Sequence, residues 1–96
     1  MKQDRSILVV EDEQATRDLV CAQLGADYEV RSASNGEEAL AAVKQRSFDL
    51  MLLDVNLPGI SGLDVLEQIA DLENAPTVIM VSADGVVANA VRALRE

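Results

Sequence analysis

The sequence has few aromatic residues, few cysteines and few basic residues. It contains one tyrosine, one phenylalanine, no tryptophan and one cysteine, and its 8 lysines and arginines face 17 acidic residues. A lone cysteine cannot form an internal disulfide, and nothing else in the sequence points to an oxidising compartment. Because 49% of the residues are apolar and so few of them are aromatic, the interior of the protein must be aliphatic.

The net charge of −9 limits the partners of the chain. Nucleic acids and anionic membranes are bound through lysine and arginine, so this charge argues against direct contact with either. A basic protein surface or a bound cation suits the charge better.

The length suits one small domain over residues 1–96, and the sequence shows no linker, repeat or low-complexity segment. Residues 2–6 are polar, and the apolar run after them is too short for a signal peptide. No stretch approaches membrane-spanning length. We therefore expect a soluble cytoplasmic protein.

The apolar run Leu50–Leu53, followed at once by Asp54, is the centre of the pattern. Such a run is typical of a strand buried on both faces, as in a parallel sheet covered by helices. Asp54 would then lie at the carboxyl end of the strand, where open α/β sheets place their sites. Leu57-Pro58-Gly59 predicts a turn directly afterwards, because proline cannot donate to a ladder and glycine permits positive φ. From this stretch alone, Asp54 could equally be a turn former or a helix cap.

Strands and helices alternate along the chain. Strands are predicted at residues 7–10, 28–31, 49–54 and 77–81. Helices are predicted at residues 14–25 and 37–46, from residue 61, and after residue 85. Three strands are wholly apolar, whereas the second alternates and so belongs at an edge. The pattern predicts a doubly wound α/β fold, with a parallel sheet of order 2-1-3-4 and helices on both faces.

Each predicted helix has apolar residues at helical spacing. They are Leu19, Val20 and Leu24 in the first, Ala39, Leu40 and Val43 in the second, Leu63, Leu66, Ile69 and Ala70 in the third, and Val87, Ala90, Val91 and Leu94 in the last. Cys21 lies in the first of these helices and is expected to be a core or boundary residue.

The carboxyl ends of the first, third and fourth strands carry Glu11-Asp12, Asp54 and Ser82. Neighbouring parallel strands lie under about 5 Å apart, so acids from the first and third strands can share one cation. Acids gathered without a cation would repel one another and raise the pKa of at least one of them. Mg²⁺, which accepts a few carboxylates and keeps several waters, suits this arrangement. The alternative is a solvated acidic loop, which is common in so acidic a protein.

Three segments together resemble the receiver domain of bacterial two-component response regulators. They are Ile7–Glu13, Asp49–Leu63 and Val78–Ala83, and the resemblance runs in unbroken order from Ile7 to the end of the chain. Each motif is weak alone, but the combination is specific. The resemblance implies a flavodoxin-like fold, in which a receiver protein has the strand order 2-1-3-4-5.

The resemblance implies a phosphoacceptor site. Asp54 would take a phosphoryl group from a phosphohistidine on a sensor histidine kinase or a phosphotransfer protein, and carboxylates do form such aspartyl-phosphates. Ser82 would hydrogen-bond the phosphoryl group and draw its loop inward, and Ala83 would leave that group room. Such a domain is no enzyme, beyond catalysing its own phosphorylation and dephosphorylation.

The resemblance also implies the ligands of a Mg²⁺ ion. Asp12 and Asp54 would bind the ion, Glu11 would act through metal-bound water, and Asn56 would offer its backbone carbonyl. This agrees with the chemistry, because phosphoryl transfer needs mainly positioning and cations on the equatorial oxygens.

The chain departs from the family at its end. Receivers continue into a fifth strand, with a lysine that pairs with the phosphate, and then into a fifth helix. Here the sequence stops at Glu96, and its lysines, Lys2 and Lys44, lie elsewhere. We therefore expect a receiver shortened at its carboxyl end. Its fourth strand would leave Val78–Val81 as an open edge, which predicts a homodimer or higher oligomer through that edge.

Three other functions stay open. The missing lysine favours a receiver-like interaction module that is not phosphorylated. A phosphatase with an aspartyl nucleophile would need a second acid where Asn56 stands. A nucleotide binder would need a glycine-rich phosphate loop after the first strand, where this chain has acids. Labelling of Asp54 by a small phosphodonor would distinguish the first of these from a phosphorylated receiver.

Overall fold

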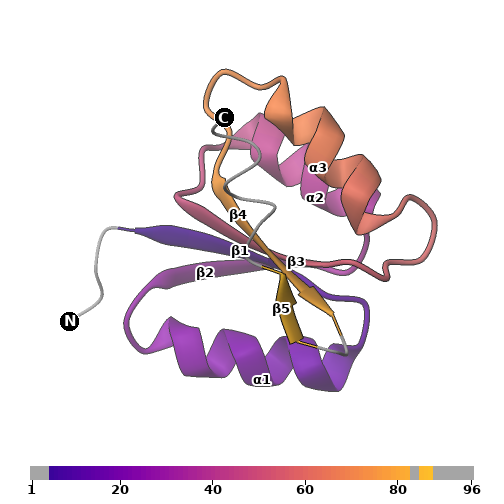
Figure 1. Cartoon of the computed structure of the whole chain (residues 1–96). Helices are drawn as coiled ribbons and strands as arrows, with labels where there is room; N and C mark the ends of the chain where they lie inside the picture. The colour runs from indigo at the N-terminus through magenta and orange to yellow at the C-terminus, as the bar shows by residue number, and fades with distance from the viewer. Residues whose placement is uncertain (1–4, 83–84, 88–96) are drawn as a thin grey trace.

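A central parallel sheet carries three helices in the computed structural model, which describes residues 5–82 and 85–87 (Figure 1). The strands are β1 (Ser6–Val10), β2 (Glu29–Ala33), β3 (Leu50–Asp54), β4 (Thr77–Ser82) and β5 (Gly85–Val87). The helices are α1 (Gln14–Gly25), α2 (Gly36–Gln45) and α3 (Gly62–Ala70). The strand order is β2-β1-β3-β4-β5, and β1 to β4 are parallel. The predicted α/β fold and the order 2-1-3-4 are confirmed.

One face of the sheet is covered by α2 and α3, which lie together at the top of Figure 1. The side chains of this face that are at most 1% exposed are Leu8 and Val10 of β1, Met51 and Leu53 of β3, and Val78 and Met80 of β4. The parallel register places each of them beside its counterpart on the next strand. Val65 and Ile69 of α3 pack against this layer and are fully buried. The main core is aliphatic, as the composition predicts.

The opposite face of the sheet carries α1 (Figure 1) and is less completely buried. Ile7 and Val9 of β1 are buried here, where α1 packs chiefly against β1 and β2. Leu50 and Leu52 of β3 are only half-buried, because they lie farther from this helix. The prediction that the run Leu50–Leu53 is buried on both faces therefore holds for one face only.

Two leucines of the predicted apolar helix faces are exposed: Leu19 of α1 is 60% exposed and Leu63 of α3 is 57% exposed. In α3 the fully buried Val65 marks the face that packs on the sheet. At 100° per residue, Leu63 lies about 200° around the helix from Val65, so it points to solvent. The face assigned to α3 from its leucine spacing was wrong at this position. No residue of α1 is fully buried.

The turn after β3 and the start of α3 follow the sequence signals. Gly59 has a φ of 77°, which confirms the prediction of a turn that uses the freedom of glycine. Ser61 then caps α3, because its Oγ accepts a hydrogen bond from the Asp64 N–H at 3.2 Å. The Asp64 carboxylate in turn accepts one from the Ser61 N–H at 3.3 Å. This reciprocal pair is a capping box, and it fixes where α3 begins beside β3.

β5 replaces the beginning of the predicted last helix. Val87 pairs with Met80 and Val86 with Val81, antiparallel to β4. The helix prediction is therefore wrong at Val87. Val86 and Val87 are β-branched, and their backbone gains hydrogen-bond partners when it lies along the open edge of β4. Ala90, Val91 and Leu94 lie outside the described residues. The predicted open edge at Val78–Val81 is also wrong for Met80 and Val81, which β5 covers.

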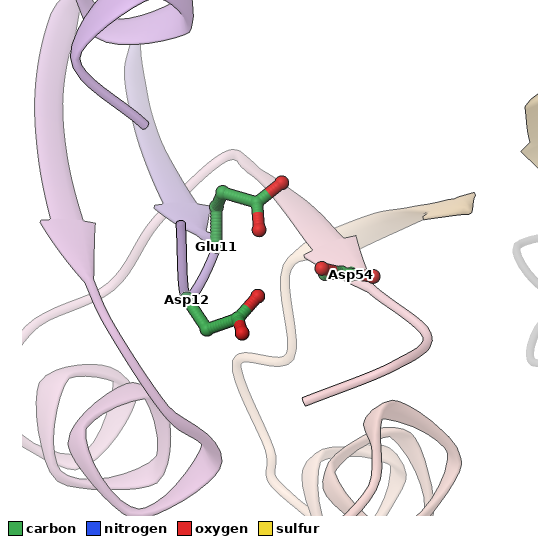
Figure 2. A group of neighbouring side chains, drawn as sticks. All are labelled: Glu11, Asp12 and Asp54. Carbon is green, nitrogen blue, oxygen red and sulfur yellow. The ribbon is translucent and has the colours of Figure 1, made fainter. Parts of the chain in front are cut away.

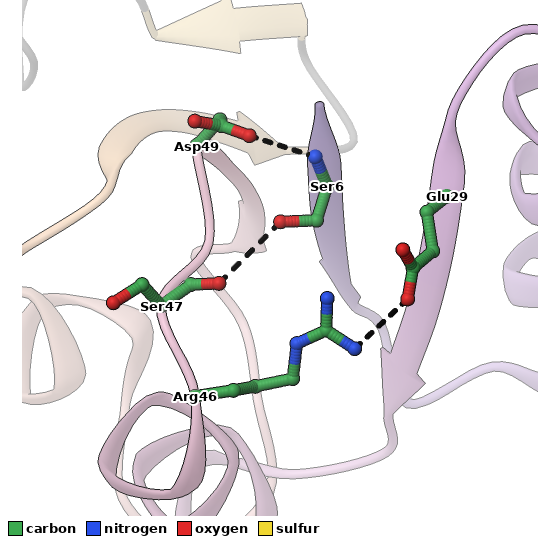
Figure 3. A network of polar contacts seen from close by, with 5 residues as sticks. All are labelled: Ser6, Glu29, Arg46, Ser47 and Asp49. Carbon is green, nitrogen blue, oxygen red and sulfur yellow. Dashed lines mark hydrogen bonds and ion pairs between the residues drawn. The ribbon is translucent and has the colours of Figure 1, made fainter. Parts of the chain in front are cut away.

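Polar contacts join the amino-terminal ends of the strands, at the end of the sheet away from Asp54 (Figure 3). The Ser6 N–H donates to Asp49 Oδ2 at 2.8 Å, which ties β1 to the residue before β3. Arg46 Nη1 lies 2.9 Å from Glu29 Oε1, which ties the end of α2 to β2. The Arg46 guanidinium also lies 5.1 Å from the centre of the Phe48 ring, a cation–π distance.

Candidate functional site

Asp54, the last residue of β3, is held in place by its neighbours. It stands opposite Val81 in the register, and the next amide, Val55 N–H, donates to the Val81 carbonyl at 2.9 Å. The Asn56 N–H donates to Asp54 Oδ1 at 2.9 Å. This local side-chain to backbone bond orients the half-buried carboxylate. One oxygen of Asp54 is thus engaged by the turn that follows the strand.

Glu11 and Asp12 follow β1, the strand beside β3. The Glu11 N–H donates to the Ala33 carbonyl at 3.0 Å, so the contact between β1 and β2 continues one residue past the strand. The chain then turns toward α1, and the Glu13 N–H donates to Glu11 Oε2 at 3.2 Å. Glu11 is half-buried and Asp12 is exposed.

The three carboxylates meet at the carboxyl ends of β1 and β3. Figure 2 shows the side chains of Glu11 and Asp12 directed toward Asp54. One carboxylate oxygen from each residue lies within 4.8 Å of the other two. The parallel sheet brings together the acids that the sequence places at neighbouring strand ends.

Burial, together with the neighbouring acids, perturbs the ionisation of Glu11. Its pKa is raised from 4.5 to about 7, first because burial removes water from the charged form. Hydrogen bonding with the Asp12 and Asp54 side chains and repulsion by the Asp54 charge raise the pKa further. The hydrogen bond from the Glu13 backbone acts in the opposite direction. Negative charge is thus unfavourable here without a cation.

The residues fit a hard divalent cation. Three carboxylates supply oxygen donors only, which is the donor type that Mg²⁺ prefers. They border an open cavity of about 420 Å³, which leaves room for the waters that Mg²⁺ retains. Besides the acids, the cavity is lined by Glu13, Thr16, Asn56 and Val81.

Gly62 brings α3 against the end of β3, a close approach that the sequence analysis did not identify. A Cβ atom at Gly62 would lie 2.4 Å from the carbonyl oxygen of Asp54 and 2.9 Å from Cα of Val55. The Gly62 N–H also donates to the Val55 carbonyl at 3.2 Å. The sequence did contain a signal of this contact. Gly62 directly follows the helix cap, at a position where residues with a better helix propensity are favoured, so a glycine there indicates a steric requirement.

The remaining predicted site residues, and the two lysines that were expected to lie away from the site, have different outcomes. Ser82 is the last residue of β4, and its backbone pairs with Gly85. Ala83 and Lys2 lie outside the described residues. Lys44 lies in α2, beside a cavity formed by the ends of α2 and α3, and so away from the acids. Metal ligation by the Asn56 carbonyl stays a prediction.

The fold and the acids define an α/β protein with an acidic site where two adjacent parallel strands end. Comparison with known proteins gives its family. Residues 7–96 match the family model of the response regulator receiver domain, so the chain belongs to this family. The resemblance inferred from the sequence motifs is confirmed.

Curated relatives include much longer proteins. The transcriptional regulatory protein ResD of Bacillus subtilis is 39% identical over 90 residues, which make up 93% of this chain and 37% of that protein. The protein-glutamate methylesterase/protein-glutamine glutaminase of Agrobacterium fabrum is 45% identical over 80 residues, or 80% of this chain and 22% of that protein. The chain therefore spans well under half the length of these relatives.

Solved structures with the same fold include receiver proteins. The response regulator TrrA of Thermotoga maritima, in complex with Mg²⁺-BeF, has a TM-score of 0.77 and is 40% identical, covering 82% of this chain and 70% of that one. The chemotaxis response regulator CheY4 of Vibrio cholerae has a TM-score of 0.78 and is 29% identical, covering 82% of this chain and 68% of that one. The flavodoxin-like receiver fold is thus shared. No helix in the described part of this chain is long and apolar enough to cross a membrane.

Proposed function

We propose that residues 1–96 form one receiver domain that accepts a phosphoryl group on Asp54 from a sensor histidine kinase or a phosphotransfer protein. The observation that carries the proposal is the meeting of Glu11, Asp12 and Asp54 within 4.8 Å at the ends of β1 and β3. Membership of the family agrees with it, because receiver domains in two-component signalling are phosphoacceptors. Catalysis by the chain would then be limited to its own phosphorylation and dephosphorylation.

Asp54 is suited to act as the nucleophile. The Asn56 N–H engages Oδ1 at 2.9 Å, which orients the carboxylate and leaves Oδ2 free of that bond. Attack by Oδ2 would form a P–O bond while the P–N bond of the phosphohistidine breaks. The electron pair of the broken bond leaves with the imidazole, which takes up a proton. The product on this chain is an aspartyl-phosphate.

Glu11, Asp12 and Asp54 are the residues that would hold Mg²⁺, with the Asn56 carbonyl as a further ligand. The bound ion would neutralise charge on the phosphoryl oxygens during transfer. The raised pKa of Glu11, caused first by burial and then by the neighbouring acids, supports a site that is built for a cation. The Mg²⁺-BeF complex of TrrA supports the same ion for a related receiver. Ser82 and Ala83 are proposed to contact the phosphoryl group.

A partner with a basic surface suits the charge of −9, whereas nucleic acid does not. Self-association through β4 is also proposed, over a shorter edge than the sequence suggested. β5 covers Met80 and Val81. Among the described strands, none pairs with Val78 and Ile79 on the side of β4 that faces away from β3.

Incubation with acetyl phosphate and Mg²⁺, followed by intact mass measurement, tests the proposal. We expect one phosphoryl group on the wild-type chain, none on Asp54→Asn, and one on the control Asp27→Asn, which removes an exposed acid far from the site. Absence of label on the wild-type chain would instead support the interaction module that is not phosphorylated. The family membership does not favour that alternative.

A further inference from the structure

Arg17 of α1 contacts the backbone that carries two of the three acids. Its Nη1 donates to the carbonyl oxygen of Glu11 at 2.8 Å and makes a longer contact, at 3.5 Å, with the carbonyl oxygen of Asp12. One guanidinium nitrogen therefore holds the peptide groups that follow both acids. The proposed phosphorylation chemistry assigns no role to this arginine.

The Arg17 guanidinium does not line the cavity that the acids border. Arg17 is half-buried, and it is not among the described residues that line the cavity at Glu11, Asp12 and Asp54. Its hydrogen bonds to the loop go to backbone oxygens. Arg17 can therefore act on a bound cation in two ways, through the conformation of the loop and through its charge.

The loop between β1 and α1 needs such a restraint. Carboxylates within 4.8 Å of one another repel, which favours a conformation that moves them apart. Other hydrogen bonds also hold the loop. The Glu11 N–H donates to the Ala33 carbonyl, and the Glu13 N–H donates to Glu11 Oε2. At the start of α1, the Arg17 N–H donates to the Glu13 carbonyl and Thr16 Oγ1 donates to Glu13 Oε1. None of these bonds involves the Asp12 carbonyl, which the Arg17 side chain does reach. The orientation of that peptide group determines where the Asp12 side chain points.

We propose that Arg17 is a positioning residue, which holds the backbone of Glu11 and Asp12 so that both side chains stay directed at Asp54 before a cation binds. The proposal rests on the proposed function in so far as the cation is Mg²⁺. Loss of a residue that orients metal ligands typically weakens metal binding by a factor of 10 to 100. Because one of the two contacts is long, we expect the lower end of this range, about tenfold.

Positioning and charge predict opposite effects of removing Arg17. A positive charge near the acids repels a divalent cation, so loss of the charge alone would strengthen Mg²⁺ binding. Loss of the two hydrogen bonds would let the acids separate and would weaken Mg²⁺ binding. The sign of the change in affinity therefore distinguishes a positioning residue from a nearby charge.

Titration with magnesium chloride, followed through the amide NMR signals of residues 11–13 and 54–56, measures this sign. The matched control is Arg31→Gln, which removes the same charge from an exposed position on β2. We expect Arg17→Gln to bind Mg²⁺ about tenfold more weakly than wild type. Arg17→Lys should recover part of the loss, because an ammonium can still donate to a carbonyl. Arg31→Gln should bind as wild type or slightly more tightly. Equal or tighter binding by Arg17→Gln would overturn the proposal.

Amide hydrogen exchange in the metal-free chain tests the same restraint without a cation. The Glu13 amide should exchange several-fold faster in Arg17→Gln than in wild type, while the amide of Leu8 in β1 keeps its rate and shows that the sheet is intact. Unchanged exchange at Glu13 would contradict the positioning role. If the wild-type chain binds no Mg²⁺, the proposed function fails, and the exchange measurement still decides the role of Arg17.

Discussion

Substitution of Gly62 by alanine should destabilise the protein, although alanine is the better helix former. The added Cβ would lie 2.4 Å from the Asp54 carbonyl oxygen and 2.9 Å from Val55 Cα. Both are backbone atoms at the end of a central strand, so they cannot rotate away. Overpacking of this kind costs about 1–3 kcal/mol, against a gain of about 1 kcal/mol from helix propensity. Because the clash is with backbone atoms, we expect the upper part of that range, about 2–3 kcal/mol, and therefore a net loss of about 1–2 kcal/mol in the free energy of unfolding.

Two other glycines supply matched controls for this prediction. At Gly25, at the end of α1, a Cβ would meet nothing within 4 Å, so Gly25→Ala should stabilise the protein by about 0.4–1 kcal/mol. At Gly36 a Cβ would lie 2.5 Å from Cγ1 of Ile60 and 2.7 Å from Cγ2 of Val65. Because these are side-chain atoms, which can yield in part, Gly36→Ala should fall between the other two variants.

Urea unfolding of the three variants and the wild type, followed by circular dichroism, measures the series. The slope of the free energy against urea should stay the same, so that midpoints report stability. A loss of 1 kcal/mol should lower the melting temperature by about 4–8 °C in a domain of this size. If Gly62→Ala proves as stable as wild type, or no less stable than Gly25→Ala, the close approach between α3 and β3 is refuted.

Three further predictions concern ionisation, capping and association. Because the folded-state pKa of Glu11 is raised from 4.5 to about 7, its protonated form favours folding below pH 4.5, and this contribution is lost as the pH rises through 7. In metal-free urea unfolding, the stability of wild type relative to Glu11→Gln should therefore fall between pH 5 and pH 8, and a relative rise would contradict the account. In the same assay, Ser61→Ala should lower the free energy of unfolding by about 1 kcal/mol, because it removes the capping box. The control Ser47→Ala, at an exposed position, should leave the free energy of unfolding almost unchanged. Equal losses in the two variants would argue against the cap. Light scattering at micromolar concentration should show a dimer or a larger species, and a stable monomer would refute association through the edge at Val78 and Ile79.

The strand order and the acidic site could be predicted because both depend on local patterns. Leu50–Leu53 is apolar and is followed directly by Asp54, and parallel strands place their carboxyl ends together. The meeting of Asp54 with Glu11 and Asp12 then follows from the position of β1 beside β3. The polar alternation of the second strand gave the correct edge.

The errors concern features that depend on packing between segments. Leu50 and Leu52 are half-buried because α1 lies chiefly over β1 and β2. The apolar character of the two leucines gives no information about the position of that helix. Leu63 is exposed because the helix face is selected by its contact with the sheet. Val87 pairs with β4, although the spacing of the apolar residues suited a helix. The edge of a strand offers hydrogen bonds to the backbone, and the spacing of apolar residues gives no information about them.

Gly62 and Arg17 were missed for a related reason. Their contacts with the backbone of Asp54, Glu11 and Asp12 arise from the path of two loops, and no apolar periodicity marks such contacts. Both residues support the acids through backbone atoms. Reasoning from side-chain chemistry alone therefore finds the acids and not the residues that hold them.

The central claim is that Asp54 carries the phosphoryl group, and localisation of that group tests it most directly. The chain is treated with acetyl phosphate and Mg²⁺, the acyl phosphate is trapped by borohydride reduction, and the modified residue is identified by tandem mass spectrometry. The account predicts modification of Asp54, with Glu11 and Asp12 unmodified. Modification of Glu11, Asp12 or any other acid in place of Asp54 would contradict it.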